Sequence, residues 1–264
     1  MLKDKVIVIG GCGDGMGHAM AVRAAAQGAK VILTARSLPR LEAIAAEVND
    51  AGGTAVPIAC DMSVLDDCKK VAQTTIDRFG KIDGVSMIAC MNPDHKLFAD
   101  TDEDFAAWRE ITDVNLWGTL QLVKQCLKGM SRGGSVAIVG SQTSNDGHWP
   151  YVAPYAAAKA ALGAVVRLIA FENGIQHGNT GIRFNMLSAG GVANAPYYEY
   201  VQTLADINKT TYGEQLQHMA QAYPLGYVPK PEEYADALIF LMSDMSAAVN
   251  GLDIHANGGS YMRS

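Results

Sequence analysis

The sequence KVIVIGGCGDGMG at residues 5–17 decides the fold. A short apolar run, typical of a buried strand, leads into a loop in which five of the eight residues 10–17 are glycine. A helical, alanine-rich stretch follows and ends at Gly28. This order places main-chain N–H groups and a helix N-terminus together, so it predicts a site for a dinucleotide diphosphate. The alternative is an ordinary tight turn between a strand and a helix.

Asp14 puts a carboxylate inside this anion-binding loop. Two explanations fit the sequence. Aspartate is a favoured N-cap, so Asp14 can accept a hydrogen bond from the main chain of the following helix. It can also pair with Arg36. The two differ in consequence, because pairing would engage a cation that could otherwise bind a phosphate.

Apolar runs alternate with longer helical patterns along almost the whole chain. The runs are apolar throughout, as in strands that helices cover on both faces. Right-handed crossovers between them give a doubly wound parallel sheet. We expect one α/β domain of Rossmann type over residues 1–264, with about seven strands and a substrate lid at about 193–228. Strands are expected at 5–10, 30–35, 54–61, 83–90, 134–141, 181–189 and 252–259, and helices at 15–27, 38–53, 65–79, 103–130, 155–175 and 231–242.

The composition limits the partners. The chain carries a formal net charge of −6 and no basic run, which argues against nucleic acid and an anionic membrane surface. No stretch approaches the roughly 18–20 apolar residues that span a bilayer, and the N-terminus does not resemble a signal peptide. The five cysteines are scattered without a CxxC pair, which indicates reduced thiols in a cytoplasm and no metal site.

A second group of residues carries acid–base chemistry. Ser141 ends the fifth expected strand, and the helix after it opens with Tyr155 and Lys159. Residues at i and i+4 share one face of a helix, so the phenol and the ammonium can converge. A nearby cation stabilises a phenolate, so we expect Lys159 to lower the pKa of Tyr155 from its reference value near 10. The pair then forms a usable acid or base near neutral pH.

Several motifs, in the same order, resemble those of the short-chain dehydrogenase/reductase family over nearly the whole chain. They are the glycine loop at 11–17, Asp61 after the third strand, VNLWGT with Asn115, VAIVGS with Ser141, Tyr155-x-x-x-Lys159, and PLGYVPKPEEYADALIFLMSD followed by NG. The resemblance implies an enzyme that moves a hydride between NAD or NADP and a ketone or secondary alcohol.

The resemblance also implies roles for these residues. Tyr155 would protonate the carbonyl oxygen during reduction, or take the hydroxyl proton during oxidation, and Lys159 would hold the nicotinamide ribose. Ser141 would orient the substrate oxygen, with Ser144 the weaker candidate, and Asn115 would fix a water that relays protons through Lys159. The residues predicted to contact the cofactor are Gly11, Asp14, Gly15, Met16, Gly17, Arg36, Ser37, Asp61, Met62, Ala89, Tyr155, Lys159, Gly190, Val192 and Asn194.

Three positions depart from the family pattern. The usual Asn-Asn-Ala-Gly after the fourth strand ends here in Cys90, which adds a side chain where glycine lets the backbone approach the cofactor. The usual Pro-Gly after the sixth strand is Ala189-Gly190, which we expect to form a looser turn. Asn194 replaces a threonine and can still donate to the carboxamide or the diphosphate.

The end of the second strand indicates the dinucleotide. An acidic residue there binds the ribose 2′-OH of NAD, whereas an arginine accommodates the 2′-phosphate of NADP. Ala35 stands at the position of the acid, and Arg36 and Ser37 follow it. We therefore expect NADP(H) to be favoured over NAD(H), although the carboxylate of Asp14 acts against a phosphate nearby.

The substrate wall is predicted from residues after the fourth, fifth and sixth strands. Lys209 is the single lysine or arginine between 184 and 229, which disfavours a phosphorylated or carboxylate-rich substrate. We expect an uncharged, largely apolar ketone or secondary alcohol, cyclic or aromatic. The tyrosines among these residues could equally pack a lid helix onto the body. The wall residues are Met91, His95, Ser141, Trp149, Tyr151, Tyr155, Tyr197, Tyr198, Tyr200 and Met219.

Two alternative functions use the same fold. A 3-oxoacyl-carrier-protein reductase would need a basic surface patch near the site. A non-catalytic nucleotide-sensing protein would be expected to lose Tyr155 or Lys159, and both are present. The resemblance further implies a homotetramer, or a homodimer, paired through the helices near 103–130 and 155–175.

Overall fold

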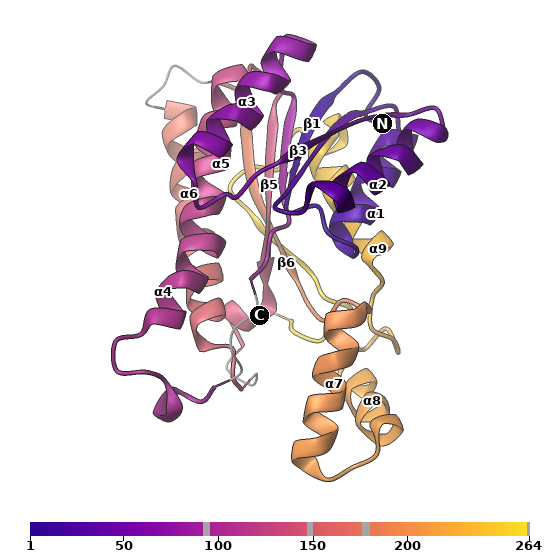
Figure 1. Cartoon of the computed structure of the whole chain (residues 1–264), viewed down its shortest axis with the longest axis vertical. Coiled ribbons are helices and arrows are strands. Elements are labelled where there is room, and N and C mark those ends of the chain that lie inside the picture. The colour runs from indigo at the N-terminus through magenta and orange to yellow at the C-terminus, as the bar shows by residue number, and fades with distance from the viewer. Residues whose placement is uncertain (92–95, 147–149, 176–179, 263–264) are drawn as a thin grey trace.

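The computed structural model describes residues 1–91, 96–146, 150–175 and 180–262. Its centre is a parallel sheet in the order β3-β2-β1-β4-β5-β6-β7 (Figure 1). The order reverses between β1 and β4, so the carboxyl ends of these two strands flank the switch point where ligands bind on such sheets. The strands are β1 (Val6–Gly10), β2 (Lys30–Ala35), β3 (Thr54–Ala59), β4 (Gly84–Met87), β5 (Ser135–Ser141), β6 (Arg183–Ala189) and β7 (Asp253–Ala256).

Helices cover both faces of the sheet (Figure 1). Strand β1 shows why, because Ile7 and Ile9 pack into the core beneath α1, α2 and α9, whereas Val6 and Val8 pack toward α3, α5 and α6. The expected doubly wound α/β fold is confirmed. The α-helices are α1 (Met16–Ala26), α2 (Leu38–Asp50), α3 (Leu65–Phe79), α4 (Ala106–Thr112), α5 (Thr119–Cys126), α6 (Ala153–Ile175), α7 (Ala195–Asn208), α8 (Tyr212–Gln221) and α9 (Pro231–Met242).

The helix expected at 103–130 is not continuous. A π-helical segment, Asp113–Gly118, separates α4 from α5. Within it the side chain of Asn115 donates to the main-chain oxygen of Ile111 at 3.0 Å. A side chain that bonds the preceding turn competes with the regular ladder, and single π-turns inside helices occur frequently at functional sites.

The stretch predicted as a lid contains α7 and α8, which project from the body below the sheet (Figure 1). Asn194 caps α7 by accepting from the main-chain N–H of Tyr197 at 3.2 Å. Tyr197 and Val201 of α7 pack against Met219 of α8 in a small apolar core of their own. The two helices therefore hold each other through a cluster separate from the two main cores.

Helix α6 corrects one expectation from the sequence. Its residues Ala153–Asn173 are long and apolar enough, with a mean hydropathy of 1.3 over 18 residues, to meet the criterion for a membrane-crossing helix. Many of its residues are alanines. Their combined hydropathy keeps the mean high although polar residues interrupt the apolar ones. Ala158, Leu162 and Val166 pack into the core on one face of the sheet. A core helix of a globular protein passes the same test.

Candidate active site

The glycine loop lies at the carboxyl end of β1, against the end of β4. Gly11 adopts a positive φ of 83°, and a Cβ on it would clash with the main chain of Ala89. The N–H groups of Gly11 and Cys12 both donate to the Thr34 oxygen at 2.9 Å, which ties the loop to β2. The close approach of three strand ends therefore requires glycine at position 11.

The open side of this loop fits a dinucleotide diphosphate. The first N–H groups of α1, from Met16 onward, have no partner within the helix and carry its positive dipole end. A Cβ on Gly15 would lie 2.8 Å from Nδ2 of Asn194, so the Asn194 amide faces the loop from the far side. Gly13 has nothing within 4 Å of such a Cβ. The cradle thus combines N–H donors, a side-chain amide and free space.

Asp14 neither caps α1 nor pairs with Arg36, the two roles that the sequence suggested. The N-cap of α1 is Gly15, with no side-chain cap hydrogen bond. The Asp14 carboxylate instead pairs with Nε of Arg40 at 3.2 Å, and both side chains are largely exposed. Capping and pairing with Arg36 were both wrong, because Arg40, on the first turn of α2, reaches the loop. The loop's negative charge is balanced without Arg36.

The ends of β2 and β3 form the adenine side of the predicted site. Asp61 accepts from the N–H and the hydroxyl of Ser63 at 2.9 and 2.6 Å. These bonds lower the pKa of Asp61, and the charge of Arg36 contributes in the same direction. Ser37 stands at the N-cap of α2, and the Met62 oxygen accepts from Gln121 at 3.1 Å. The geometry brings Arg36 and Asp61 together at this edge.

Ser141 ends β5 with its hydroxyl fixed by neighbours. Its Oγ accepts from the Thr143 N–H at 3.2 Å and lies 2.9 Å from Oγ1 of Thr143. It also hydrogen bonds to the phenol of Tyr155. The Ser144 hydroxyl turns back to the main-chain oxygen of Ser141. Ser141 is therefore the serine that reaches Tyr155, and Ser144 is not.

Lys159 lies beneath this pair and is fully buried. Its Nζ donates to the main-chain oxygens of Val139, at 2.8 Å, and Ala89, at 3.3 Å. It stands 5.6 Å from the centre of the Tyr155 ring. The ammonium is therefore anchored at the ends of β5 and β4, near the phenol, and its hydrogen bonds within the described part of the chain go to main-chain oxygens.

The expected lowering of the Tyr155 pKa is wrong for the protein as it stands. Burial raises the pKa of Tyr155 well above its usual value, the Cys90 thiol acts in the same direction, and the Ser141 hydrogen bond only opposes them. Burial also lowers the pKa of Lys159. Sequence spacing showed that the two side chains share a helix face, but not that desolvation would raise the pKa of the phenol.

Cys90 is a neighbour of Tyr155 in the structure. In the sequence it was notable only because it replaces the glycine that is usual in the family. Its thiol hydrogen bonds to the Tyr155 phenol. Although solvent reaches Cys90, the groups packed around the thiol raise its pKa, with Lys159 and Tyr155 opposing that effect. The thiol therefore belongs to the group of side chains around the phenol.

Asn115 holds the loop after β4. Its Oδ1 accepts from the Met91 N–H at 3.1 Å and its Nδ2 donates to the Met91 oxygen at 3.0 Å. The side chain thus clamps both polar groups of one residue of the predicted substrate wall. These contacts give Asn115 a structural function. Its role in a proton relay stays a prediction.

The chain just after β6 is bound by residues that lie far from it in the sequence. The Gly191 N–H donates to Oη of Tyr223 at 3.0 Å, and the Gly191 oxygen accepts from Oη of Tyr234 at 2.7 Å. The Ala193 N–H donates to the Pro229 oxygen at 2.9 Å. Distant segments therefore constrain the chain just after the Ala189-Gly190 turn, where no proline does so.

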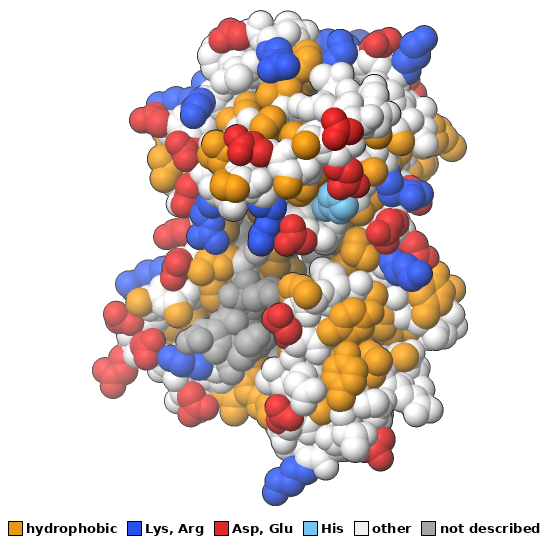
Figure 2. Space-filling model, turned by 45° about the vertical axis from the view of Figure 1, so that its right-hand side comes forward, with side chains coloured by type: hydrophobic (Ala, Val, Ile, Leu, Met, Phe, Trp, Pro, Cys, Tyr) orange, Lys and Arg blue, Asp and Glu red, His pale blue; other side chains and the backbone are white. Residues whose placement is uncertain are grey.

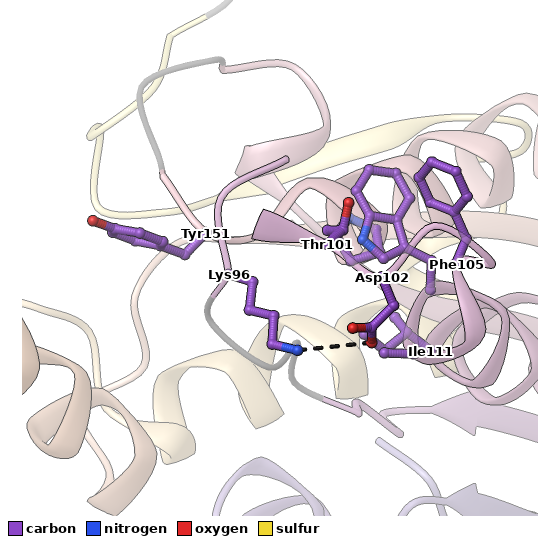
Figure 3. Close-up of a pocket in the computed structure, with 9 residues that line it drawn as sticks. Lys96, Thr101, Asp102, Phe105, Ile111 and Tyr151 are labelled. Carbon is purple, nitrogen blue, oxygen red and sulfur yellow. Dashed lines mark ion pairs between the residues drawn. The ribbon is translucent and has the colours of Figure 1, made fainter. Parts of the chain in front are cut away.

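The predicted substrate residues separate into groups. Met91 lies at the site, and Tyr197 is buried against Gly191 and the lid core. Tyr151 contributes to a small pocket with Phe105 and Ile111, beside which Lys96 and Asp102 pair at 3.7 Å (Figure 3). His95 and Trp149 lie outside the described residues.

Sequence reasoning missed several residues that the structure brings to the site. Thr143 could have been noticed as a hydroxyl two residues after Ser141, and Arg40 as a cation four residues after Arg36. Nothing in the local sequence points to Tyr223, which lies 32 residues from Gly191. Its contact depends on how the chain returns after the lid.

Comparisons with known proteins agree with this fold. A family model described as enoyl-(acyl carrier protein) reductase matches residues 11–261. The short-chain reductase protein NovJ of Streptomyces niveus is 30% identical, with 97% of this chain and 94% of that protein covered. A probable tetrahydroxynaphthalene reductase of Zymoseptoria tritici is 27% identical, with 99% and 96% covered. The crystal structure of levodione reductase superposes with a TM-score of 0.88 at 27% identity, covering 98% of each chain.

The fold, the dinucleotide cradle and the Ser141–Tyr155–Lys159 group define an NAD(P)-dependent oxidoreductase that interconverts alcohols and ketones. The family expected from the motifs is confirmed over residues 11–261. This chain belongs to the short-chain dehydrogenase/reductase family.

Proposed function

We propose that the protein is a ketoreductase that favours NADP(H) and acts on an uncharged, largely apolar ketone or secondary alcohol. The observation that carries this proposal is the hydrogen bond between Ser141 and Tyr155 above the anchored ammonium of Lys159. The group lies at the same edge of the sheet as the glycine loop, so a dinucleotide on the loop extends toward it.

The chemistry follows from these side chains. The bound dinucleotide supplies the hydride in reduction and accepts it in oxidation. The Ser141 hydroxyl, fixed by Thr143, donates a hydrogen bond to the substrate oxygen and orients it. The Tyr155 phenol gives its proton to that oxygen in reduction and takes the proton back in oxidation. Lys159 places positive charge beneath the phenol, which favours the phenolate that reduction leaves.

The preference for NADP(H) rests on the ends of β1 and β2. Strand β2 ends in Ala35 rather than an acidic residue, and Arg36 follows it. Because Arg40 neutralises Asp14, the guanidinium of Arg36 is available for a 2′-phosphate. These contacts support NADP(H) without excluding NAD(H).

The apolar substrate is supported by the surface around the lid. Figure 2 shows a group of hydrophobic side chains at the lower right of the view, in the part of the molecule that holds α7 and α8. Exposed apolar side chains on and beside the lid include Tyr198, Ile207 and Tyr212. The name of one relative, a probable tetrahydroxynaphthalene reductase, also fits a cyclic or aromatic substrate.

A homotetramer or homodimer is proposed through the helices that flank the site. Trp117 is 56% exposed, and Leu168 and Phe171 of α6 are 61% and 59% exposed. We infer an interaction surface from these exposed, large apolar side chains. We also propose a cytoplasmic location, supported by five cysteines that are all free.

A substrate panel run with NADPH and with NADH tests the function. The panel holds cyclic and aromatic ketones, a carrier-linked 3-oxoacyl chain, and L-rhamnose, because another relative is named an L-rhamnose 1-dehydrogenase. We expect turnover of apolar ketones, faster with NADPH. Preference for the carrier-linked chain would replace the proposed substrate. Dinucleotide binding with no turnover of any compound would favour the nucleotide-sensing alternative.

A further inference from the structure

The segment that follows β6 is held from three sides by residues distant in the sequence. Tyr223, at the end of the lid, accepts from the Gly191 N–H at 3.0 Å. Tyr234, on α9, donates to the Gly191 oxygen at 2.7 Å. Both polar main-chain groups of one residue are thereby bound by phenol oxygens. The position of Val192, one residue further on, is fixed by these two bonds.

This segment is closely packed at both of its glycines. A Cβ on Gly191 would clash with Oη of Tyr223 and with the Tyr197 ring. A Cβ on Gly190 would lie 3.0 Å from Cβ of Asn257 and 3.1 Å from Oε1 of Gln142. The two glycines therefore lie between the lid tyrosines on one side and the end of β7 with Gln142 on the other.

The same contacts extend to the catalytic serine. Gln142 follows Ser141 directly and is 2% exposed. Its Oε1 accepts from the Ser260 hydroxyl at 2.6 Å. Burial raises the pKa of Tyr223, and its hydrogen bonds with the Gly191 N–H and with the Ser260 side chain oppose this rise, so Ser260 contacts both Tyr223 and Gln142. A chain of hydrogen bonds thus connects Gly191, Tyr223, Ser260 and Gln142.

We propose that Tyr223 is a positioning residue that sets the nicotinamide end of the cofactor site by holding Gly191 through its main-chain N–H. The inference rests on the proposed function and on the role that the family resemblance implies for Val192, whose main chain would meet the nicotinamide carboxamide. In this chain the turn has Ala189 where a rigid proline would stand, and the phenol of Tyr223 supplies the missing constraint.

The test compares two ligands that differ in the nicotinamide. Kd is measured by calorimetry for NADPH and for 2′-phospho-ADP-ribose, which lacks the nicotinamide ring, with the wild type and Tyr223→Phe. Removing the hydroxyl leaves the Gly191 N–H without its partner and frees the turn. We expect Kd for NADPH to rise about tenfold, as expected for one lost hydrogen bond. Kd for 2′-phospho-ADP-ribose should change by less than about twofold.

Controls separate positioning from folding. Tyr227→Phe is the matched control, because its phenol bonds Glu233 on the surface at 2.5 Å and not Gly191. Tyr234→Phe should weaken NADPH binding selectively, as Tyr223→Phe does. Equal weakening of both ligands by Tyr223→Phe, or no change in either, would overturn the proposal. A wild type that binds neither ligand would instead overturn the proposed function.

Discussion

Nζ of Lys159 lies 5.6 Å from the centre of the Tyr155 ring, yet it donates hydrogen bonds to the main-chain oxygens of Val139 and Ala89. Burial, and not this cation, is the main cause of the shift in the pKa of Tyr155. The acid–base behaviour of Tyr155 is therefore set by its whole surroundings rather than by the spacing of two residues on a helix.

The pH dependence of alcohol oxidation follows from this arrangement. The pKa of Tyr155 is raised mainly by burial, so the phenol stays protonated well into the alkaline range in the free protein. Oxidation needs the phenolate, and we expect its kcat/KM to rise with pH without a plateau below the usual tyrosine pKa. Reduction needs the protonated phenol and should lose rate only in that alkaline range. Initial rates in both directions across pH check this, and a plateau of oxidation near neutral pH would contradict it.

Cys90 should shift that profile. Its thiol raises the pKa of Tyr155, so Cys90→Ala removes that contribution and moves the rise of the oxidation rate to lower pH. An unchanged profile would show that the thiol does not influence the phenol. Iodoacetamide gives a second measurement, because Cys90 is exposed while the other four cysteines are buried. Alkylation should inactivate the wild type, more slowly when NADPH is bound, and should leave Cys90→Ala active.

The pair between Asp14 and Arg40 should tune dinucleotide preference. Arg40→Ala leaves the Asp14 carboxylate unbalanced near the 2′-phosphate, so we expect the KM for NADPH to rise and the KM for NADH to change little. Asp14→Ser should have the opposite effect on NADPH. Each change should be a few-fold, because exposed ion pairs contribute up to about 1 kcal/mol. Equal effects on both dinucleotides would place the pair away from the phosphate.

Two glycines of the loop should respond differently to alanine. Gly11→Ala adds a Cβ against Ala89 at a φ of 83°, whereas Gly13→Ala enters open space. Backbone strain of about 1–3 kcal/mol should lower the Tm of Gly11→Ala by several degrees and weaken dinucleotide binding. Gly13→Ala should keep its Tm, as measured by calorimetry. Similar losses in both variants would mean that the clash at Ala89 is relieved elsewhere.

The outer face of α6 provides a test of self-association. Phe171→Glu places a charge on the apolar face that also carries Leu168, and we expect a smaller species by size-exclusion chromatography with light scattering. Val64→Glu is the control, because Val64 is exposed at the start of α3, on a different part of the surface. A wild type that is already monomeric would contradict the proposed assembly.

The sequence by itself determined the doubly wound sheet and the family. Fully apolar strands and a glycine loop between a strand and a helix are local patterns, and local patterns follow from backbone sterics and burial. The i, i+4 spacing likewise placed Tyr155 and Lys159 on one face of α6. It also selected Ser141, which the structure places against Tyr155.

Only the tertiary structure decided the partners of these residues. Asp14 meets Arg40 rather than Arg36, Cys90 meets Tyr155, and Gly191 meets Tyr223 across 32 residues of chain. The pKa of Tyr155 likewise depends on burial by several elements. These contacts, and the desolvation that they cause, arise because separate segments meet at the carboxyl edge of the sheet. The spacing of residues along the chain does not predict which segments meet there.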